Sequence, residues 1–317
     1  MKHAQVDEIL QTLPQPRQVF HYFRDRYALE LLAWASHGGR KIAELKRGPE
    51  AGLLQKAPAR EILARCGSGI VTELDWRAWW PSRYQTYMLT FCRHGLYRKR
   101  SVRWCEQISR RGHNLVLMLC LNRAHEIFCR ELVGPERKVS TYSHFSDEQD
   151  LPVLAWSRLD VELADDEALI EEVQNDWIRE VRTERAHQGP MTREVWRSGG
   201  KTTWVSDLNR RELERYYEQV IRPHERIWDE AMLLATLLFI RNELGVRKVF
   251  YHTVSSSNVL KRFSRYWHPP RSLYTDLPRR FGFRLTREAP RMVAREAGRR
   301  FDRAQRDGRV AWFVREL

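Results

Sequence analysis

The chain has 317 residues, 42% of them hydrophobic, including 12 Trp, 11 Tyr and 12 Phe. This much apolar and aromatic surface offsets the entropy lost on folding, which excludes a wholly disordered chain. The length suits one large domain with an appendage, or two domains. No uncharged apolar run of about 18 residues occurs, and the segment MKHAQVDEIL has no apolar stretch of the secretory type. We therefore expect a cytoplasmic protein with no membrane partner.

The charge balance predicts an acidic partner. Lys and Arg number 55 against 41 Asp and Glu, a formal net charge of +14, and most of the cations are Arg. Arg binds phosphate with a rigid two-pronged fork, so nucleic acid or another polyanion is one interpretation, and the codon bias of a GC-rich genome is the other. In residues 83–104 aromatic side chains alternate with cations, as in a single-strand groove or a solvated sheet edge. The candidate nucleic-acid contacts are Arg93, Arg98, Lys99 and Arg100.

The cysteines argue against a metal or disulfide framework. They are odd in number, show no CxxC spacing and lie at Cys66, Cys92, Cys105, Cys120 and Cys129. This pattern predicts reduced thiols and no metal site.

Residues 1–68 predict a helical N-terminal region. Apolar residues recur every three or four positions over 19–35, and a pair of glycines then supplies a stop signal. Shorter helices are expected at 41–47 and 58–66.

Residues 69–290 predict a sheet with helices around it. Runs rich in β-branched and aromatic residues predict strands at 84–92, 114–122, 153–163 and 168–177. The polar connection 164–167 predicts an antiparallel hairpin between the last two strands. A helix is expected at 123–133, and the charged stretch at about 178–225 predicts a helical insertion.

The rest of the chain alternates between the two element types. We expect a buried helix at 226–245, a strand at 246–254, a helix starting at Asn258 and a closing strand within 273–285. Residues 291–317 predict a basic C-terminal helix. The fold class is therefore α+β, with a mixed, mainly antiparallel sheet.

Two stretches resemble the GNAT acyltransferases. ELGVRKVFYHTVSSSN (243–258) is similar to the central strand of that family and its following Asn, and LYTDLPRRFGF (273–283) is similar to its closing Tyr and Gly-Phe element. IEEVQNDW also resembles an EEIQSDW strand in a domain of phage and plasmid multidomain proteins. The likeness covers about 130 residues, 151–285.

The resemblance implies a GNAT-like topology in which the strand 168–177 splays away to admit the pantetheine arm of an acyl-CoA. It further implies transfer of an acyl group to an amine. The family's Arg/Gln-x-x-Gly-x-Gly/Ala loop, which holds pyrophosphate on backbone N–H groups, does not follow Trp177. The cofactor therefore stays open between acyl-CoA and another acyl donor.

The strand IEEVQNDW carries the candidate catalytic carboxylates. Alternation places Glu172, Gln174 and Asp176 on one face and Glu171 on the other. Glu172 or Asp176 is the expected base, with Gln174 binding substrate or cofactor. The alternative is that these carboxylates pair with some of the many Arg residues.

The second half of the candidate site follows the strand 246–254. His252 and Tyr274 are expected to be catalytic, and Ser255, Ser257 and Asn258 to bind substrate or cofactor. A hydrogen-bonded core histidine is the alternative for His252.

Three functions follow from these patterns. The first is a GNAT-like N-acyltransferase. The second is a non-catalytic, basic nucleic-acid-binding protein of a phage or other mobile element. The third is a GNAT-shaped scaffold without cofactor that binds a protein partner.

Overall fold

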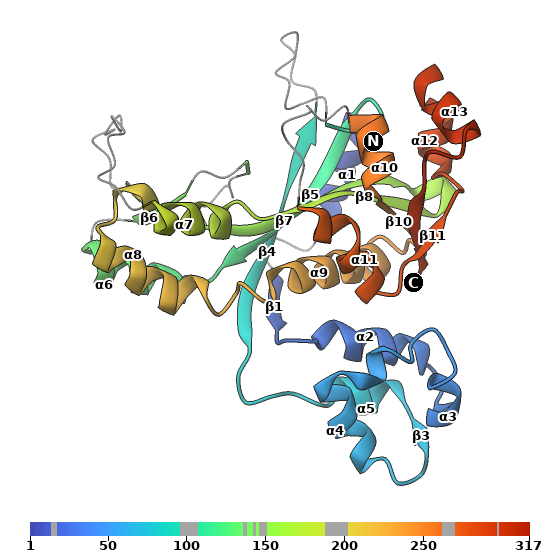
Figure 1. The fold of residues 1–317 in the computed structure, drawn as a ribbon, viewed down its shortest axis with the longest axis horizontal. Helices are drawn as coiled ribbons and strands as arrows, with labels where there is room; N and C mark the ends of the chain where they lie inside the picture. Colours follow the sequence, from blue (N-terminus) through green and yellow to red (C-terminus); the bar gives the residue numbers. More distant parts are fainter. Residues whose placement is uncertain are drawn as a thin grey trace.

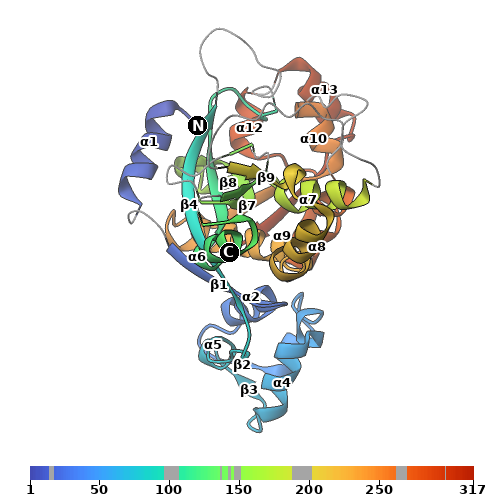
Figure 2. The same cartoon turned by 90° about the vertical axis from the view of Figure 1, so that its left-hand side faces the viewer.

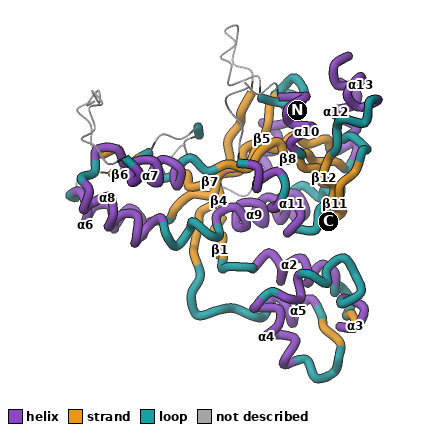
Figure 3. Tube along the Cα trace, viewed as in Figure 1, coloured by secondary structure: helices purple, strands orange, loops and turns teal. Residues whose placement is uncertain are grey.

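The structure is a computed structural model. It describes residues 1–13, 18–95, 107–135, 138–141, 144–145, 151–187, 202–261, 270–296 and 298–317. One large sheet runs through the molecule, with helices on both sides of it (Figures 1 and 3). Its strands, in spatial order, are β1 (Gln18–Tyr22), β4 (Gln85–Gly95), β5 (His113–Leu121), β7 (Val153–Glu162), β8 (Glu167–Gln174), β10 (Lys248–His252), β12 (Trp312–Glu316) and β11 (Arg284–Thr286).

All neighbours in this sheet are antiparallel except β8 and β10, which are parallel. The predicted α+β class with a mixed, mainly antiparallel sheet is thus confirmed. The hairpin between β7 and β8 is also present. Its connection is the 3-10 turn η3 (Leu163–Asp165), followed by Asp166 in the left-handed conformation, with φ 57°.

The two faces of the sheet are covered by different helices. On one face, α9 (Trp228–Asn242) packs against β7 and β8, and a hydrogen bond of 2.7 Å joins Ser157 to Thr236. On the other face, α10 (Val254–Lys261), α12 (Arg291–Glu296) and α13 (Arg299–Arg306) cover a separate cluster that includes Leu169, Phe250 and Trp312. Ten of the 15 residues of α9 are buried, because this helix lies between the sheet and α2 (Arg26–Ala35).

A small lobe projects from the sheet at the bottom of Figures 1 and 2. Its elements are α2 (Arg26–Ala35), β2 (Arg40–Lys41), α3 (Ile42–Leu45), η1 (Leu53–Gln55), α4 (Ala57–Arg65), β3 (Ile70–Val71) and α5 (Glu73–Arg77). The indole of Trp76, fully buried, donates to Ser36 Oγ at 3.0 Å and ties α5 to the end of α2. We call residues 26–77 the helical lobe.

The region before the lobe differs from the predicted helix over 19–35. After α1 (His3–Thr12), which packs on β4 and β5, residues 18–22 form the edge strand β1, and helix starts only at Arg26. Phe20 and Tyr22 are buried and alternate with a less buried neighbour. The spacing of the aromatic residues fits both a strand and a helix. Hydrogen bonding to β4 selects the strand.

A second projection gathers helices from three parts of the chain (left in Figure 1). It contains α6 (Arg123–Val133), α7 (Trp177–Ala186), η4 (Val205–Asp207), α8 (Arg210–Tyr216) and the π turn η5 (Tyr217–Ile221), with β6 (Lys138–Ser140) parallel to β9 (Thr202–Trp204). Tyr216 joins them, because its hydroxyl lies 2.8 Å from both Trp177 Nε1 and His125 Nε2.

The C-terminal prediction also needs correction. Residues 291–317 form α12 and α13 and then the strand β12, which enters the sheet between β10 and β11. The stretch 273–285 is mostly helical, as η6 (Arg271–Tyr274) and α11 (Asp276–Arg280), and its strand begins only at Arg284. Across the described part of the chain, every helix is too short or too polar to span a lipid bilayer.

Candidate functional site

The candidate site lies where the pairing of β8 with β10 ends. The parallel pairing runs from Glu167 opposite Lys248 to Ile170 opposite Tyr251, and β10 itself ends at His252. Beyond that pair, residues 172–174 are paired with β7 alone among the strands that the structure describes. A β-bulge sits at the same point, since β7 pairs Arg158 with Glu172 and the next residue with Ile170. Glu171 is therefore the extra residue, so the simple alternation of faces fails there.

Glu171 collects buried polar partners from three other segments. Its carboxylate accepts hydrogen bonds of 2.9 Å from both the backbone N–H and the hydroxyl of Ser109. His252 Nε2 lies 3.1 Å from Glu171 Oε2, and Lys261 Nζ lies 3.4 Å from that oxygen. Lys261 also donates to the backbone carbonyl of Glu171. We call Ser109, Glu171, His252 and Lys261 the Glu171 cluster.

Protonation in this cluster follows from burial and charge. Burial, together with the charge of Lys261, lowers the pKa of His252 to about 4, so the ring is neutral at pH 7. Burial alone would raise the pKa of Glu171, but Lys261 and His252 outweigh it and hold that pKa below its ordinary value. An ionised Glu171 can only accept, so the hydrogen of His252 is assigned to Nε2. Nδ1, 2.9 Å from Ser256 Oγ, then accepts from that hydroxyl.

A buried ion pair lies beside the cluster. Arg158 Nη2 is 2.5 Å from Glu172 Oε2, and both side chains are 3% exposed. The same nitrogen donates to the carbonyl of Gln107 at 2.9 Å. Glu172 is thus the charge partner of a buried arginine, and its other carboxylate oxygen has no hydrogen bond from a described residue.

Two tyrosines complete the site. Tyr251 and Tyr274 are buried, their rings meet edge to face at 6.1 Å, and the hydroxyl of Tyr251 has no hydrogen-bond partner within the described chain. The hydroxyl of Tyr274 interacts with that of Ser257. Burial, and then the charge of Glu172, raises the pKa of Tyr274 well above its ordinary value. This hydroxyl is therefore a protonated donor at neutral pH.

Asp176 lies beyond the end of β8, at the start of α7. Its carboxylate accepts from His144 at 2.7 Å, Gln174 at 2.8 Å, Arg179 at 2.6 Å and the indole of Trp156 at 3.3 Å. Burial would raise the pKa of Asp176, but His144 and Gln174 lower it. Gln174 is thus engaged with Asp176. Asn175, and not Asp176, caps α7, accepting from the N–H of Ile178 at 2.8 Å.

Two residues predicted to bind substrate or cofactor, Ser255 and Asn258, are not part of the Glu171 cluster. Asn258 is exposed on α10, which begins at Val254 and not at Asn258, because Ser256 Oγ accepts from the N–H of Thr253. Ser255 bonds Thr253 and the N–H of Ala311.

The predicted nucleic-acid contacts are only partly visible. Arg93 forms an ion pair with Asp7 of α1, so its charge is compensated. Arg98, Lys99 and Arg100 lie outside the described residues.

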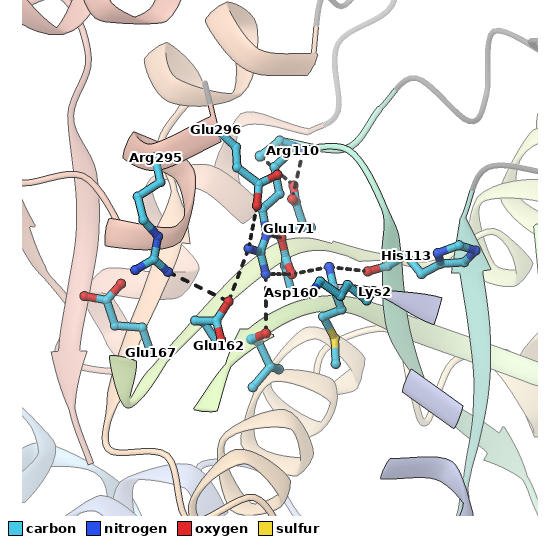
Figure 4. A network of polar contacts seen from close by, with 12 residues as sticks. Lys2, Arg110, His113, Asp160, Glu162, Glu167, Glu171, Arg295 and Glu296 are labelled. Atoms are coloured by element: carbon cyan, nitrogen blue, oxygen red, sulfur yellow. Dashed lines mark hydrogen bonds and ion pairs between the residues drawn. The ribbon is translucent and has the colours of Figure 1, made fainter. Parts of the chain in front are cut away.

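A second polar network holds the segment that carries Ser109 (Figure 4). Arg110 donates to both oxygens of Asp160, at 2.6 and 2.9 Å, and the same carboxylate binds the ammonium of Met1 at 2.9 Å. Backbone hydrogen bonds of 2.9 Å also run both ways between Met1 and His113. These contacts anchor residues 109–113 next to β7, and so fix Ser109 against Glu171.

Sequence reasoning identified Glu172, His252 and Tyr274 but missed four members of the site: Ser109, Arg158, Glu171 and Lys261. The doubled glutamate signalled Glu171, but the bulge that turns it into the cluster depends on β7. Nothing in the sequence around Lys261 indicates a role in the site, because its contact is with the backbone carbonyl of Glu171, 90 residues away in the chain.

No group of three potential metal ligands occurs among the residues that the structure describes. Cys66 and Cys129 are free thiols, and Cys105 lies outside the described residues. Comparison with protein-family models, with curated proteins and with solved structures finds no match.

Proposed function

We propose that this protein is an N-acyltransferase of GNAT-like topology, in which an acyl thioester enters between β8 and β10. The observation that carries the proposal is that the pairing of β8 with β10 ends, after Ile170 and Tyr251, next to a set of proton-transfer groups. The resemblance of residues 243–258 and 273–283 to GNAT elements, which implies that the strand 168–177 splays for a pantetheine arm, supports the same placement.

The part of β8 beyond its pairing with β10 suits the arm of such a donor. Along residues 171–174 the strand lacks a partner on the β10 side within the described chain, and an unpaired strand edge binds extended ligands through its N–H and C=O groups. A pantetheine arm has two amides to pair with it. Lys261 holds the carbonyl of Glu171, so the arm displaces this lysine where it binds.

The proposed reaction needs two proton transfers, one to Glu172 and one from Tyr274. The amine nitrogen attacks the thioester carbonyl, the carbon–sulfur bond breaks, and the amide forms. The free oxygen of Glu172 takes the proton that the amine loses. The Tyr274 hydroxyl gives a proton to the departing thiolate. Arg158 keeps Glu172 in place, and His252 and Glu171 position the end of β8.

The start of α7 disfavours the nucleotide end of coenzyme A. A pyrophosphate needs successive N–H groups at a helix N-terminus, whereas here Asn175 accepts from the N–H of Ile178, the Asp176 carboxylate lies at the same end, and α7 contains no glycine. The proposed donor is therefore held by its thioester arm and not by its nucleotide.

The test is release of free thiol by the purified chain from acetyl-CoA and from acetyl-pantetheine, with polyamines and lysine peptides as acceptors. Tyr274→Phe is expected to lower kcat by about 10²-fold or more, because the leaving thiolate loses its acid. The control is Tyr216→Phe, a buried tyrosine outside the site, which leaves kcat unchanged.

Absence of thiol release from both donors in the folded wild type would contradict the proposal. Binding of single-stranded nucleic acid with a steep salt dependence would then favour the nucleic-acid alternative. A folded chain with neither property would favour the scaffold.

A further inference from the structure

A cavity of about 650 Å³ lies between the helical lobe and the end of the sheet. The lobe contributes Tyr27 of α2 and the stretch 49–56. The opposite wall is built by α11, β11 and β12. A volume of this size accommodates a small organic ligand.

Cations dominate the wall of this cavity. It is lined by Lys56, Arg279, Arg280, Arg284 and Arg315, against two acidic residues, Glu50 and Glu316. Lys56 is paired with Asp25 at 3.0 Å, and Arg280 with Asp229 and Glu230. Arg279, Arg284 and Arg315 form no ion pair with any residue that the structure describes. Three guanidinium groups therefore share one cavity without carboxylate partners.

Arg315 is held in place although its charge is poorly compensated. Burial lowers its pKa to about 10, and the cations Arg241 and Arg284 act in the same direction, while Glu50 opposes them. Its guanidinium donates to the carbonyl of Phe281, and its Nε has no partner.

The glycine at 282 permits this position. It has φ +73°, and a Cβ built there would collide with Arg315 Nη1. The guanidinium of Arg315 can therefore lie in this position only because residue 282 has no side chain.

A second buried polar group faces the same cavity. Tyr27 is fully buried, its ring stacks on Phe281 with centroids 4.4 Å apart, and its hydroxyl interacts with the ammonium of Lys56. Tyr27 and Arg315 come from opposite walls. Both walls therefore carry hydrogen-bond donors.

We propose that this cavity binds a small molecule bearing a phosphate chain, the chemical class of the nucleoside di- and triphosphates. Three guanidinium groups without an ion-pair partner in the described chain outnumber the two carboxylates of the wall and favour a ligand with more than one negative charge, and the arginine fork matches phosphate oxygens in pairs. The rings of Tyr27 and Phe283 add an apolar side to the wall.

The cavity is separate from the acyl-transfer site. Arg315 and Glu316 pair with Val249 and Lys248, at the start of β10, whereas the pairing with β8 ends at the opposite end of that strand. This inference therefore stands or falls independently of the proposed function.

The experiment is calorimetric titration of the full chain with inorganic tripolyphosphate at low salt, with citrate as a comparison anion. Tripolyphosphate is expected to bind and to raise the melting temperature, because it binds the folded state only. The double variant Arg279→Gln/Arg284→Gln is expected to lose about ten- to hundredfold in affinity. These exposed side chains form no ion pair in the described chain, so their loss leaves folding intact.

Two further variants sharpen the result. Arg299→Gln, an exposed arginine on α13 outside the cavity, is the matched control and is expected to leave affinity unchanged. Gly282→Ala displaces Arg315 and is expected to weaken binding. The inference is overturned if tripolyphosphate does not bind, if citrate binds equally well, or if the double variant binds as tightly as the control.

Discussion

Glu172 and Arg158 show how one contact bears on both stability and chemistry. Each is almost fully buried, and each is the other's charge partner. Taking two charges out of water is costly, so the pair is stabilising only as long as both members remain. The sequence allowed two roles for Glu172, a catalytic base or a charge partner of an arginine. The structure shows the ion pair with Arg158.

Replacing Glu172 by Gln is therefore expected to destabilise the fold. The change leaves Arg158 buried and uncompensated, at a cost of about 3–5 kcal/mol in the free energy of unfolding. Urea unfolding followed by circular dichroism measures it. Glu218→Gln, which breaks an exposed helical pair with Arg222, is the control and is expected to leave the unfolding midpoint nearly unchanged. A stability equal to wild type in Glu172→Gln would show that the pair contributes nothing.

Among the elements, the junction of β8 and α7 is where we expect the choice between donors to be made. The helix begins directly after the strand, and Asp176 bonds four side chains around that junction. A carboxylate at a helix N-terminus satisfies the positive end of the helix dipole that an anionic ligand would otherwise use.

Asp176→Asn is expected to change the choice between donors. Loss of the charge removes about 1 kcal/mol of repulsion toward a pyrophosphate, so the KM for acetyl-CoA is expected to fall about fivefold while that for acetyl-pantetheine stays the same. The ratio of the two KM values is the readout, since it cancels any general loss of folded protein. An unchanged ratio would show that Asp176 does not govern donor choice.

Sequence patterns predicted the elements whose period is unambiguous. The strands β4, β5, β7 and β8, and the helices α6 and α9, lie close to their predicted ranges. β1 and β12 were missed, because their aromatic residues also fit a helix and only their strand partners select the strand. The same holds for the site, where His252 and Tyr274 are recognisable but Ser109 and Lys261 acquire their positions from the tertiary fold alone.

Over the whole molecule, buried neutral histidines are a recurring feature. Burial lowers the pKa of His94, His125, His224 and His252 to about 4 in each case. Two of them lie far from the site and bond tyrosines: His125 is 2.8 Å from Tyr216, and His224 is 2.7 Å from Tyr87. The unfolded chain, in which a histidine titrates near pH 6.5, binds protons that the folded chain does not.

Stability is accordingly expected to fall as the pH drops from about 6.5 toward 4. In that window the unfolded state holds more protons, so the free energy of unfolding rises with pH by about 1.4 kcal/mol per pH unit for each such histidine. Urea midpoints at a series of pH values measure the slope. His224→Gln is expected to reduce it by one histidine's share, and an unaltered slope would mean that His224 titrates normally in the fold.

The connection between β1 and β4 has a consequence for how the chain reaches this fold. The two strands are immediate neighbours, with Tyr22 opposite Gln85, yet residues 23–84, with the whole helical lobe among them, lie between these partners. The lobe is in effect the loop of a hairpin. The entropy of closing a loop grows only with the logarithm of its length, and a loop that has already collapsed brings its ends together at still lower cost. We therefore expect early ordering of the lobe to speed the docking of β1, so that its helices act as a scaffold for the sheet's first edge.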